Sequence, residues 1–363
     1  MLFVSSLSSR FNDSNSSYVH RITVFKEALD KRGISTKFIS VGDNVFGKPA
    51  IISPMAIPFY LNDMRKFDII HAGGNGSAYF VSIAKPFLSP NTKIIYDVHG
   101  DPIEEARLVS LYSSDIFGFA FWHSTIMELI GRKKSDYFIA CSNVLHNQLL
   151  RYGIEKSKII TIYNGVDIHN FFPIPRSPKS GLPFTVTYAG RFQKWQGIDL
   201  LLEAAQLLKD VPILFRFIGF HKDEVMLKRE IKAKLGNRAE LIDAVPRSFL
   251  NQYLSKTDLL IIPRIRHHAL EVAFPTKFAE YLATGLPIIT TDVGEIAQLV
   301  RQHHCGFVCP PFPHDLADAI VSAMQMDPKT LSILGHNART LAETRFNLET
   351  IQNLYYNFIK NIS

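Results

Sequence analysis

The sequence predicts an α/β protein made of two doubly wound, Rossmann-like domains that face a cleft. Three observations support this prediction. Short apolar runs with strand character alternate with segments of helical periodicity along the 363 residues. A proline-rich break at 171–184 divides this alternation into two similar halves. Each half is long enough to bury a core of its own.

The first half contains six predicted strands. An apolar run opens the chain at 2–6, and a polar loop follows it through Ser17. A helix is predicted over Tyr18–Arg32, ending at Gly33. Further strands are expected at 36–40, 67–74, 93–100, 136–142 and 158–165. This alternation is typical of a parallel sheet with helices on both faces.

The break at 171–184 marks the predicted boundary between a domain of residues 1–172 and a domain of residues 173–345. Helices are expected over Ile198–Lys209 and near 222–235. Strands are predicted at 184–190, 213–220, 239–244, 258–263, 286–292 and 306–310. Residues 346–363 form a predicted terminal helix. In two such domains, ligands bind beyond the carboxyl ends of the strands.

The composition is that of a globular protein, with 47% hydrophobic and 20% charged residues. The net charge of +7 is spread along the chain. Residues 1–172 carry 18 basic and 15 acidic side chains, and residues 173–363 carry 22 and 18. Because no strongly basic region stands out, we expect no nucleic-acid partner.

The protein is expected in the cytoplasm. Its three cysteines form no paired cluster, and the chain runs from Met1 directly into the first strand, without a signal peptide. No apolar stretch is long enough to span a membrane. The aromatic segment Tyr112–Trp122 and the basic Arg132–Lys134 leave two interpretations open, which are core packing or peripheral contact with the inner face of a membrane.

Two segments of the second half carry residues suited to a phosphorylated ligand. At the end of the strand at 184–190, Gly190 permits a tight turn, and Arg191 and Lys194 follow it as cations. Further on, a helix is predicted to begin near Thr276, whose free amides at 275–278 suit a diphosphate. In this helix Lys277 and Glu280 lie three residues apart, so a surface salt bridge is the alternative interpretation.

Together these segments resemble the donor site of glycosyltransferase family 4, which has the GT-B fold. The helix carries the family pattern E-x-x-A-x-G-x-P from Glu280 to Pro287. YNGVD at 163–167 and ACSN at 140–143 resemble the family's interdomain segment and the turn before it. The terminal helix resembles the one that returns to the N-terminal domain. The resemblance therefore extends over most of the chain.

The resemblance implies roles for residues of the donor site. Arg191 would contact the diphosphate of a nucleotide-sugar donor, and Glu280 would bind its ribose. The family's sugar-binding Glu corresponds to Val272, with Glu271 beside it. The family's phosphate Lys is replaced by Gln196, which leaves Lys194 and Lys277 as alternatives. The remaining donor-side positions are Gly190, the Pro275–Thr276 pair that resembles a family variant, and Val245 and Pro246 at the base.

On the acceptor side the resemblance places His99 near the donor sugar, and a structural role for this histidine is the alternative. Asp101 and Asn164 are expected nearby. Ser16 and Ser17 stand in the first loop, where many relatives have a glycine pair. The other histidines have no carboxylate or Cys partners at ligand spacing, so neither a metal nor another cofactor is expected.

The resemblance implies a retaining glycosyltransferase of the hexosyltransferase type that needs no metal. It would move a sugar to a hydroxyl group of a carbohydrate or lipid-linked acceptor. The expected setting is glycan, glycolipid or cell-surface polysaccharide synthesis. Arg191, His99 and Lys277 would be its catalytic residues. Two alternatives remain open. One is a sugar-nucleotide epimerase on the same fold. The other is a non-catalytic, sugar-nucleotide-binding partner of another transferase.

Overall fold

The computed structural model describes residues 1–5, 17–41, 57–111, 119–174 and 183–363. The chain divides into two compact units. Unit 1 comprises Met1–Asn164, Val272–Phe274 and Glu349–Ser363, and unit 2 comprises Gly165–Glu271 and Pro275–Leu348. The division after Asn164 precedes the predicted boundary at 172/173, and part of the proline-rich break, 175–182, lies outside the described residues.

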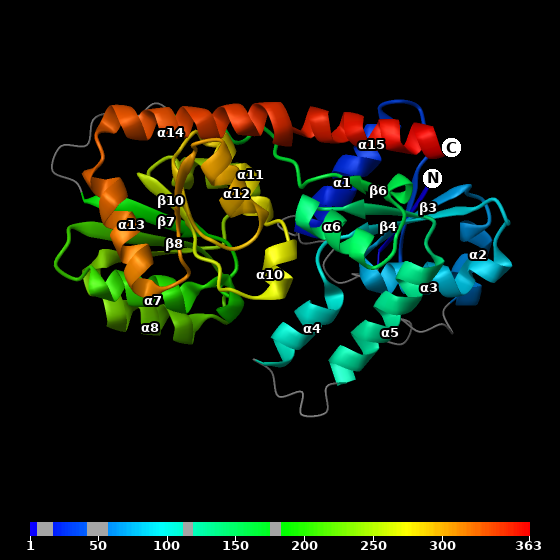
Figure 1. The fold of residues 1–363 in the computed structure, drawn as a ribbon, viewed down its shortest axis with the longest axis horizontal. Helices are drawn as coiled ribbons and strands as arrows, with labels where there is room; N and C mark the ends of the chain where they lie inside the picture. The colour runs from blue at the N-terminus through cyan, green and yellow to red at the C-terminus, as the bar shows by residue number, and fades with distance from the viewer. Residues whose placement is uncertain (6–16, 42–56, 112–118, 175–182) are drawn as a thin grey trace. The chain divides into compact units, whose positions relative to one another are not determined.

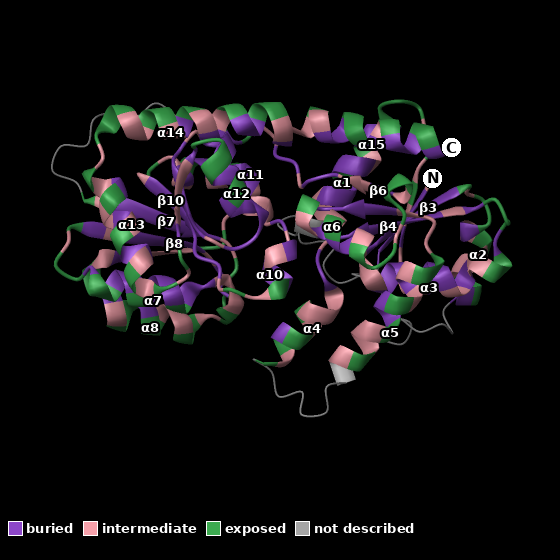
Figure 2. Ribbon diagram, in the orientation of Figure 1, coloured by how far each residue is buried: buried purple, intermediate pink, exposed green. Residues whose placement is uncertain are grey.

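Unit 1 contains a six-stranded parallel sheet with the order β2-β1-β3-β4-β5-β6. Strands β3, β4 and β6 of this sheet are labelled in Figure 1. All six predicted strands are present. They are β1 (Leu2–Ser5), β2 (Lys37–Ser40), β3 (Ile69–Gly73), β4 (Lys93–Val98), β5 (Tyr137–Ala140) and β6 (Ile159–Thr161). The inner strands β1, β3, β4 and β5 are almost wholly buried because helices cover both faces, whereas the edge strands β2 and β6 are partly exposed (Figure 2).

The helices of unit 1 lie on both faces of its sheet. They are α1 (Ser17–Asp30), α2 (Ile57–Met64), α3 (Gly74–Ala84), α4 (Pro102–Ser110), α5 (Phe119–Lys134), α6 (Asn143–Arg151) and α15 (Leu348–Ile362). Tyr355 of α15 stacks on Phe25 of α1 with ring centroids 4.1 Å apart, and its hydroxyl lies 3.0 Å from His71 Nδ1 of β3. The last helix of the chain is therefore part of unit 1.

Unit 2 contains a second six-stranded parallel sheet, with the order β12-β11-β10-β7-β8-β9. All six strands predicted for the second half are present. They are β7 (Phe184–Ala189), β8 (Ile213–Phe220), β9 (Ala239–Asp243), β10 (Leu259–Ile262), β11 (Ile288–Thr291) and β12 (Gly306–Cys309). This is the order of a dinucleotide-binding fold, in which the direction of winding reverses between β7 and β10. The predicted fold class, two doubly wound α/β units, is confirmed.

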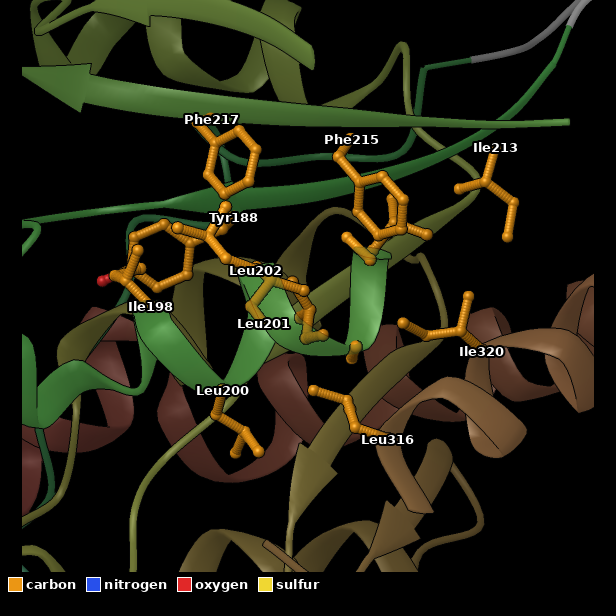
Figure 3. Packing of buried hydrophobic residues seen from close by; sticks show 14 of the residues in the cluster. Tyr188, Ile198, Leu200, Leu201, Leu202, Ile213, Phe215, Phe217, Leu316 and Ile320 are labelled. Carbon is orange, nitrogen blue, oxygen red and sulfur yellow. The ribbon is translucent and has the colours of Figure 1, made fainter. Parts of the chain in front are cut away.

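The helices of unit 2 also cover both faces of its sheet, with α7, α8 and α13 on one face and α11, α12 and α14 on the other (Figure 1). They are α7 (Ile198–Leu207), α8 (Val225–Leu235), α9 (Arg247–Leu254), α10 (His268–Val272), α11 (Thr276–Ala283), α12 (Glu295–Gln302), α13 (Pro313–Gln325) and α14 (Pro328–Leu341). Leu201 of α7 and Leu316 of α13 pack beneath Phe217 of β8 in the core (Figure 3). This core places the carboxyl ends of β7 and β10 close to α11.

None of the helices in the described part of the chain is long and apolar enough to cross a lipid bilayer. Likewise, no three His, Cys, Asp or Glu side chains of the described residues are grouped so as to hold a metal ion. The three cysteines are buried and free, and burial raises the pKa of each thiol.

Candidate functional site

The carboxyl end of β7 is tied directly to α11. The Tyr281 hydroxyl accepts a hydrogen bond from Ala189 N at 2.7 Å and donates one to Ala189 O at 3.1 Å. α11 begins at Thr276 as predicted, with Pro275 as its N-cap. The first turn of α11 therefore lies against the loop that follows β7, so two segments that were predicted separately form one site.

Gly190 lies beside Lys277. Gly190 has φ of +145°, a conformation that favours glycine, and a Cβ at this position would lie 2.5 Å from Lys277 Nζ. A side chain here would force the end of the lysine to move. Lys277 Nζ donates a hydrogen bond to the Tyr188 hydroxyl at 2.9 Å and lies 4.0 Å from the centre of that ring. The tyrosine hydroxyl in turn donates to Arg191 O at 2.5 Å.

Lys277 is held in an environment that disfavours its charge. Burial, and next the charge of Arg264, lowers its pKa to about 7, while Glu280 acts in the opposite direction. Among the described residues Lys277 forms no ion pair. Such a lysine gains its proton more readily when an anion binds beside it. A perturbed lysine of this kind is typical of a functional site.

Glu280 is buried, with 8% of its surface exposed. Its Oε1 lies 2.6 Å from Nη2 of Arg247, the first residue of α9. The Arg247 guanidinium also lies 5.9 Å from the centre of the Phe171 ring. The surface salt bridge considered between Lys277 and Glu280 is therefore absent, because each side chain has a different partner within unit 2.

The loop after β7 presents two predicted cations. Arg191 and Lys194 are both exposed, with Lys194 in a single 3-10 turn that ends at Gln196. Gly197 follows with φ of +79° and caps α7. A Cβ at Gly197 would overlap the carbonyl oxygen of Pro263, just beyond β10. The loop is therefore fixed by close backbone packing at its end.

The two positions proposed for the donor sugar differ in their surroundings. Val272 is fully buried, and its carbonyl accepts a hydrogen bond from Ser142 Oγ at 2.6 Å. Glu271 is partly exposed, and its Oε2 accepts a hydrogen bond from Gly294 N at 2.6 Å, at the N-cap of α12. Of these two residues, only Glu271 has a polar side chain.

Val245 and Pro246 precede α9 and line a hollow of about 300 Å³. Its other walls come from α9, namely Phe249, Gln252 and Tyr253, and from Lys256, two residues beyond the helix. Two aromatic side chains make this a suitable surface for a planar ring. Arg247 points from the same helix toward Glu280 instead.

In unit 1, His99 follows β4 and is anchored by a buried carboxylate. Its Nε2 lies 3.2 Å from Asp97 Oδ2. Asp97 also accepts hydrogen bonds from Arg21, at 2.9 Å from both Nε and Nη2. Burial by itself would raise the pKa of the Asp97 carboxyl, but the charges of Arg21 and His99 hold it well below its usual range. An ionised Asp97 therefore orients the imidazole of His99.

The other acceptor-side positions have mainly structural contacts. Asp101 caps α4 by accepting hydrogen bonds from the amides of Ile103 and Glu104, each at 3.1 Å. Asn164 accepts a hydrogen bond from Arg21 Nη1 at 3.2 Å and donates one to Phe274 O at 3.0 Å. Ser16 lies outside the described residues. Ser17 opens α1, and its side chain also lies outside the description.

Sequence reasoning missed three residues of these sites, namely Asp97, Tyr188 and Arg264. Arg247 belongs to the segment 245–247 that was expected at the base, but its ion pair with Glu280 was not foreseen. Arg264 follows the strand predicted at 258–263, and its place at the carboxyl end of a parallel strand was a usable signal. Tyr188 and Asp97 lie within strands, where their side chains resembled core residues.

Two family models match the chain in succession. The model for Glycosyltransferase Family 4 matches residues 20–170, and the model for Glycosyl transferases group 1 matches residues 174–341. The two matches correspond closely to the two halves of the chain.

Relatives of known name are distant. The chain is 24% identical over 225 residues to the putative colanic acid biosynthesis glycosyltransferase WcaL of Escherichia coli, covering 60% of this chain and 55% of the relative. It is 21% identical over 218 residues to the amylovoran biosynthesis glycosyltransferase AmsK of Erwinia amylovora, covering 59% and 53%. The chain thus spans about half the length of these two relatives. An uncharacterized 41.2 kDa protein from the cps region of Klebsiella pneumoniae matches over 82% of this chain and 80% of its own length, at 22% identity.

Solved structures share the whole fold. Sucrose-phosphate synthase from Thermosynechococcus elongatus superposes with a TM-score of 0.79 at 16% identity, covering 99% of this chain and 98% of that one. Anabaena HepE in complex with UDP and glucose gives a TM-score of 0.72 at 18% identity, with the same coverage. The two parallel sheets and these likenesses define a protein of the GT-B fold. With its two family-model matches, the chain belongs to the family 4-like glycosyltransferases.

Proposed function

We propose that this protein is a retaining glycosyltransferase that moves a sugar from a nucleotide diphosphate donor to an acceptor hydroxyl. The observation that carries the proposal is the approach of Gly190 to Lys277, where a Cβ would lie 2.5 Å from Nζ. This approach joins the cationic loop after β7 to the helix that carries Glu280. Cations and a carboxylate next to one another suit a diphosphate and a ribose.

The proposed reaction breaks the bond between the anomeric carbon and the phosphate oxygen of the donor. The acceptor oxygen forms a bond to that carbon, and the acceptor's proton passes to the departing diphosphate. Arg191, Lys277 and the amides of the first turn of α11 stabilise the negative charge that develops on the leaving group. Glu280 binds the ribose. The ligands named with Anabaena HepE support this chemistry, because UDP-glucose is such a donor and UDP is its leaving group.

His99 is the proposed contact of unit 1 with the reacting sugars. Asp97 orients the imidazole through Nε2, and the proposed role of the ring is to meet a hydroxyl group of the reacting sugars. Since the charge on the leaving diphosphate is offset by side-chain cations and amides, we propose that the reaction needs no metal ion. Full activity in excess chelator is the expected result. A loss of activity that Mn²⁺ or Mg²⁺ restores would contradict it.

The proposed setting is the synthesis of a cell-surface polysaccharide, glycan or glycolipid. The relatives named for colanic acid and amylovoran biosynthesis support this setting. We also propose peripheral contact with a membrane through α5, where Trp122, Ile126 and Leu129 are exposed on one helical face. Lys133 and Lys134 follow on the same helix. The part of the predicted aromatic segment at 112–118 lies outside the described residues.

Thermal unfolding in the presence of UDP, GDP and ADP tests the proposal first, because a ligand that binds the native state raises its stability. The diphosphate that stabilises the protein identifies the base. The matching sugar nucleotides are then incubated with candidate acceptors. Formation of a glycosylated acceptor is the expected result. Release of an isomerised sugar nucleotide without acceptor would favour an epimerase, and binding without any turnover would favour a non-catalytic partner.

A further inference from the structure

Arg264 lies directly beyond β10 and is buried, with 3% of its surface exposed. The backbone fixes its place. Gly197, at the end of the loop after β7, would overlap the Pro263 carbonyl if it had a Cβ, and that Cβ would lie 3.4 Å from Arg264 N. On the other side, Thr291 Oγ1 of β11 donates a hydrogen bond to Arg264 O at 2.6 Å. Arg264 is thus held at the carboxyl ends of β10 and β11, beside the cationic loop.

The guanidinium group of Arg264 lies beside Gly294, and its charge acts on Lys277. Its Nη1 lies 3.2 Å from the position that a Cβ on Gly294 would take, at the N-cap of α12. Its charge is also the second cause that lowers the pKa of Lys277. The two cations are therefore close enough to repel one another in a largely buried place.

Two neighbouring cations disfavour each other's charge, and an anion bound between them reverses the effect. A diphosphate is such an anion, and the planar fork of arginine matches its oxygens in a way that lysine does not. Meanwhile Gln196, which occupies the position of the phosphate lysine in the family pattern, is neutral. The backbone contact of the next residue, Gly197, with Pro263 brings Arg264 to the same loop from another strand.

We propose that Arg264 is a diphosphate-binding residue of the donor site and acts with Lys277 in place of the lysine that Gln196 replaces. This inference rests on the proposed function, because it requires a donor with a diphosphate. Arg264 binds the phosphate oxygens, and it takes part in transfer by stabilising the leaving group. It makes no contribution to binding the base or the ribose.

Binding of UDP, GDP and ADP, each beside its own nucleoside, is measured by calorimetry on the full chain. Arg264→Gln is expected to weaken the preferred diphosphate on the order of 10–100-fold, which is the range for one charged hydrogen bond. Nucleoside affinity is expected to stay at the wild-type value. Arg264→Lys keeps the charge and loses the planar guanidinium group. Its diphosphate affinity is expected to lie between that of the wild type and that of Arg264→Gln. Arg266→Gln is the matched control, because Arg266 is exposed two residues further on and its loss removes the same charge.

A second readout is the pH dependence of diphosphate binding. Removal of the Arg264 charge is expected to move the proton uptake of Lys277 to higher pH, because that charge helps to lower the pKa of Lys277. Equal diphosphate affinity in wild type and Arg264→Gln would overturn the inference and leave the proposed function intact. Equal losses for nucleoside and diphosphate would also overturn it, because Arg264 would then only support the fold. Failure of the wild-type protein to bind any nucleoside diphosphate would overturn the proposed function as well.

Discussion

Arg247 and Glu280 form an ion pair with 2.6 Å between Nη2 and Oε1. This pair links the first turn of α9 to α11 and holds the Glu280 carboxylate in one orientation. A carboxylate fixed in advance loses little freedom when it accepts hydrogen bonds from two ribose hydroxyls. Arg247 therefore acts as a positioning residue that orients the Glu280 carboxylate.

Replacement of Glu280 by Gln is expected to weaken the affinities for the donor and for the free nucleoside diphosphate by the same factor. The expected loss is about 1.5–3 kcal/mol, because a charged acceptor is replaced by a neutral one. Calorimetry measures both affinities. Glu343→Gln is a matched control, since Glu343 is an exposed partner of Arg339 in the same unit. Unchanged nucleotide affinity in Glu280→Gln would show that Glu280 only joins the two helices.

Removal of the loop arginine is expected to reduce turnover most. Arg191→Ala should lower the turnover number on the order of 10²–10³-fold, the range for one preorganised electrostatic contact with a developing charge. Between the two lysines, Lys277→Ala should cost more than Lys194→Ala, because Lys277 is held by Tyr188 whereas Lys194 is exposed. The turnover number at saturating donor, measured for each of the three variants, gives the order of the losses. A large loss for Lys194→Ala alone would place the second cation on the loop.

The affinity for the nucleoside diphosphate is expected to depend on pH through Lys277. Burial and the charge of Arg264 lower the pKa of this lysine to about 7, Glu280 opposes them, and the Tyr188 hydroxyl accepts its hydrogen bond. Bound phosphate favours the protonated form, so the bound pKa is higher than the free one. Binding is therefore strongest below about pH 7 and weakens as the pH rises above that value.

The lowered pKa of Lys277 also makes the free energy of unfolding depend on pH. In the unfolded chain this lysine has its ordinary pKa of 10.5, so between pH 7 and 10.5 the unfolded chain holds a proton that the folded chain has lost. The free energy of unfolding contributed by Lys277 accordingly rises with pH across that window. Calorimetric binding and urea unfolding between about pH 6 and 9 measure the two effects. Lys277→Met is expected to lose both pH dependences, that of diphosphate affinity and that of the free energy of unfolding. If Lys277→Met keeps them in full, another group causes them.

His99→Gln is expected to reduce transfer and leave the affinity for the free nucleoside diphosphate unchanged. The reason is that the proposed partner of His99 is a hydroxyl of the transferred sugar, and the free nucleoside diphosphate does not carry that sugar. Turnover and diphosphate affinity are compared for the same variant. Asp97→Asn serves as a contrast, because it leaves the buried Arg21 charge unpaired and should destabilise the fold by about 3–5 kcal/mol. A loss of diphosphate affinity in a folded His99→Gln protein would contradict the proposed role.

Replacement of Trp122 and Ile126 by Ser is expected to reduce binding to vesicles that contain phosphatidylglycerol. Both side chains are more than half exposed, at 63% and 52%, so their loss should leave the fold intact. Cosedimentation measures the binding, and circular dichroism checks the fold. Phe312→Ser is the matched control, because Phe312 is 60% exposed in the other unit. Equal vesicle binding by the double variant and the wild type would contradict membrane contact through α5.

The order of elements could be read from the sequence because it depends on local patterns. All twelve strands of the two sheets were predicted within a few residues, since each is a short apolar run between turn residues or helices. The start of α11 at Thr276 was also predicted, because Pro275 suits the position before a helix. The family pattern around Glu280 depends on spacing within one helix and was visible for the same reason.

The partners of the site residues could not be read in this way. Lys277 meets Gly190 and Tyr188 across almost ninety positions of sequence, and Glu280 pairs with Arg247 rather than with its helical neighbour. These contacts depend on how β7, α9 and α11 pack, which no local periodicity describes. Asp101 illustrates the same limit, since its place after a strand suggested an acceptor contact, whereas its carboxylate caps α4.

The sequence by itself determined the two doubly wound halves, the starts of a few helices such as α7 and α11, and the identity of the charged residues near strand ends. Alternating burial and turn chemistry are local properties, and the chain shows them without reference to its final shape. Only the tertiary structure decided which of those charged residues lie in the same site. Gly197 brings Pro263 and Arg264 to the loop after β7 through a backbone contact between distant segments, and Tyr281 fixes α11 to β7 by two hydrogen bonds. The electrostatic environment of Lys277 follows from that packing, because burial and the neighbouring arginine set its pKa.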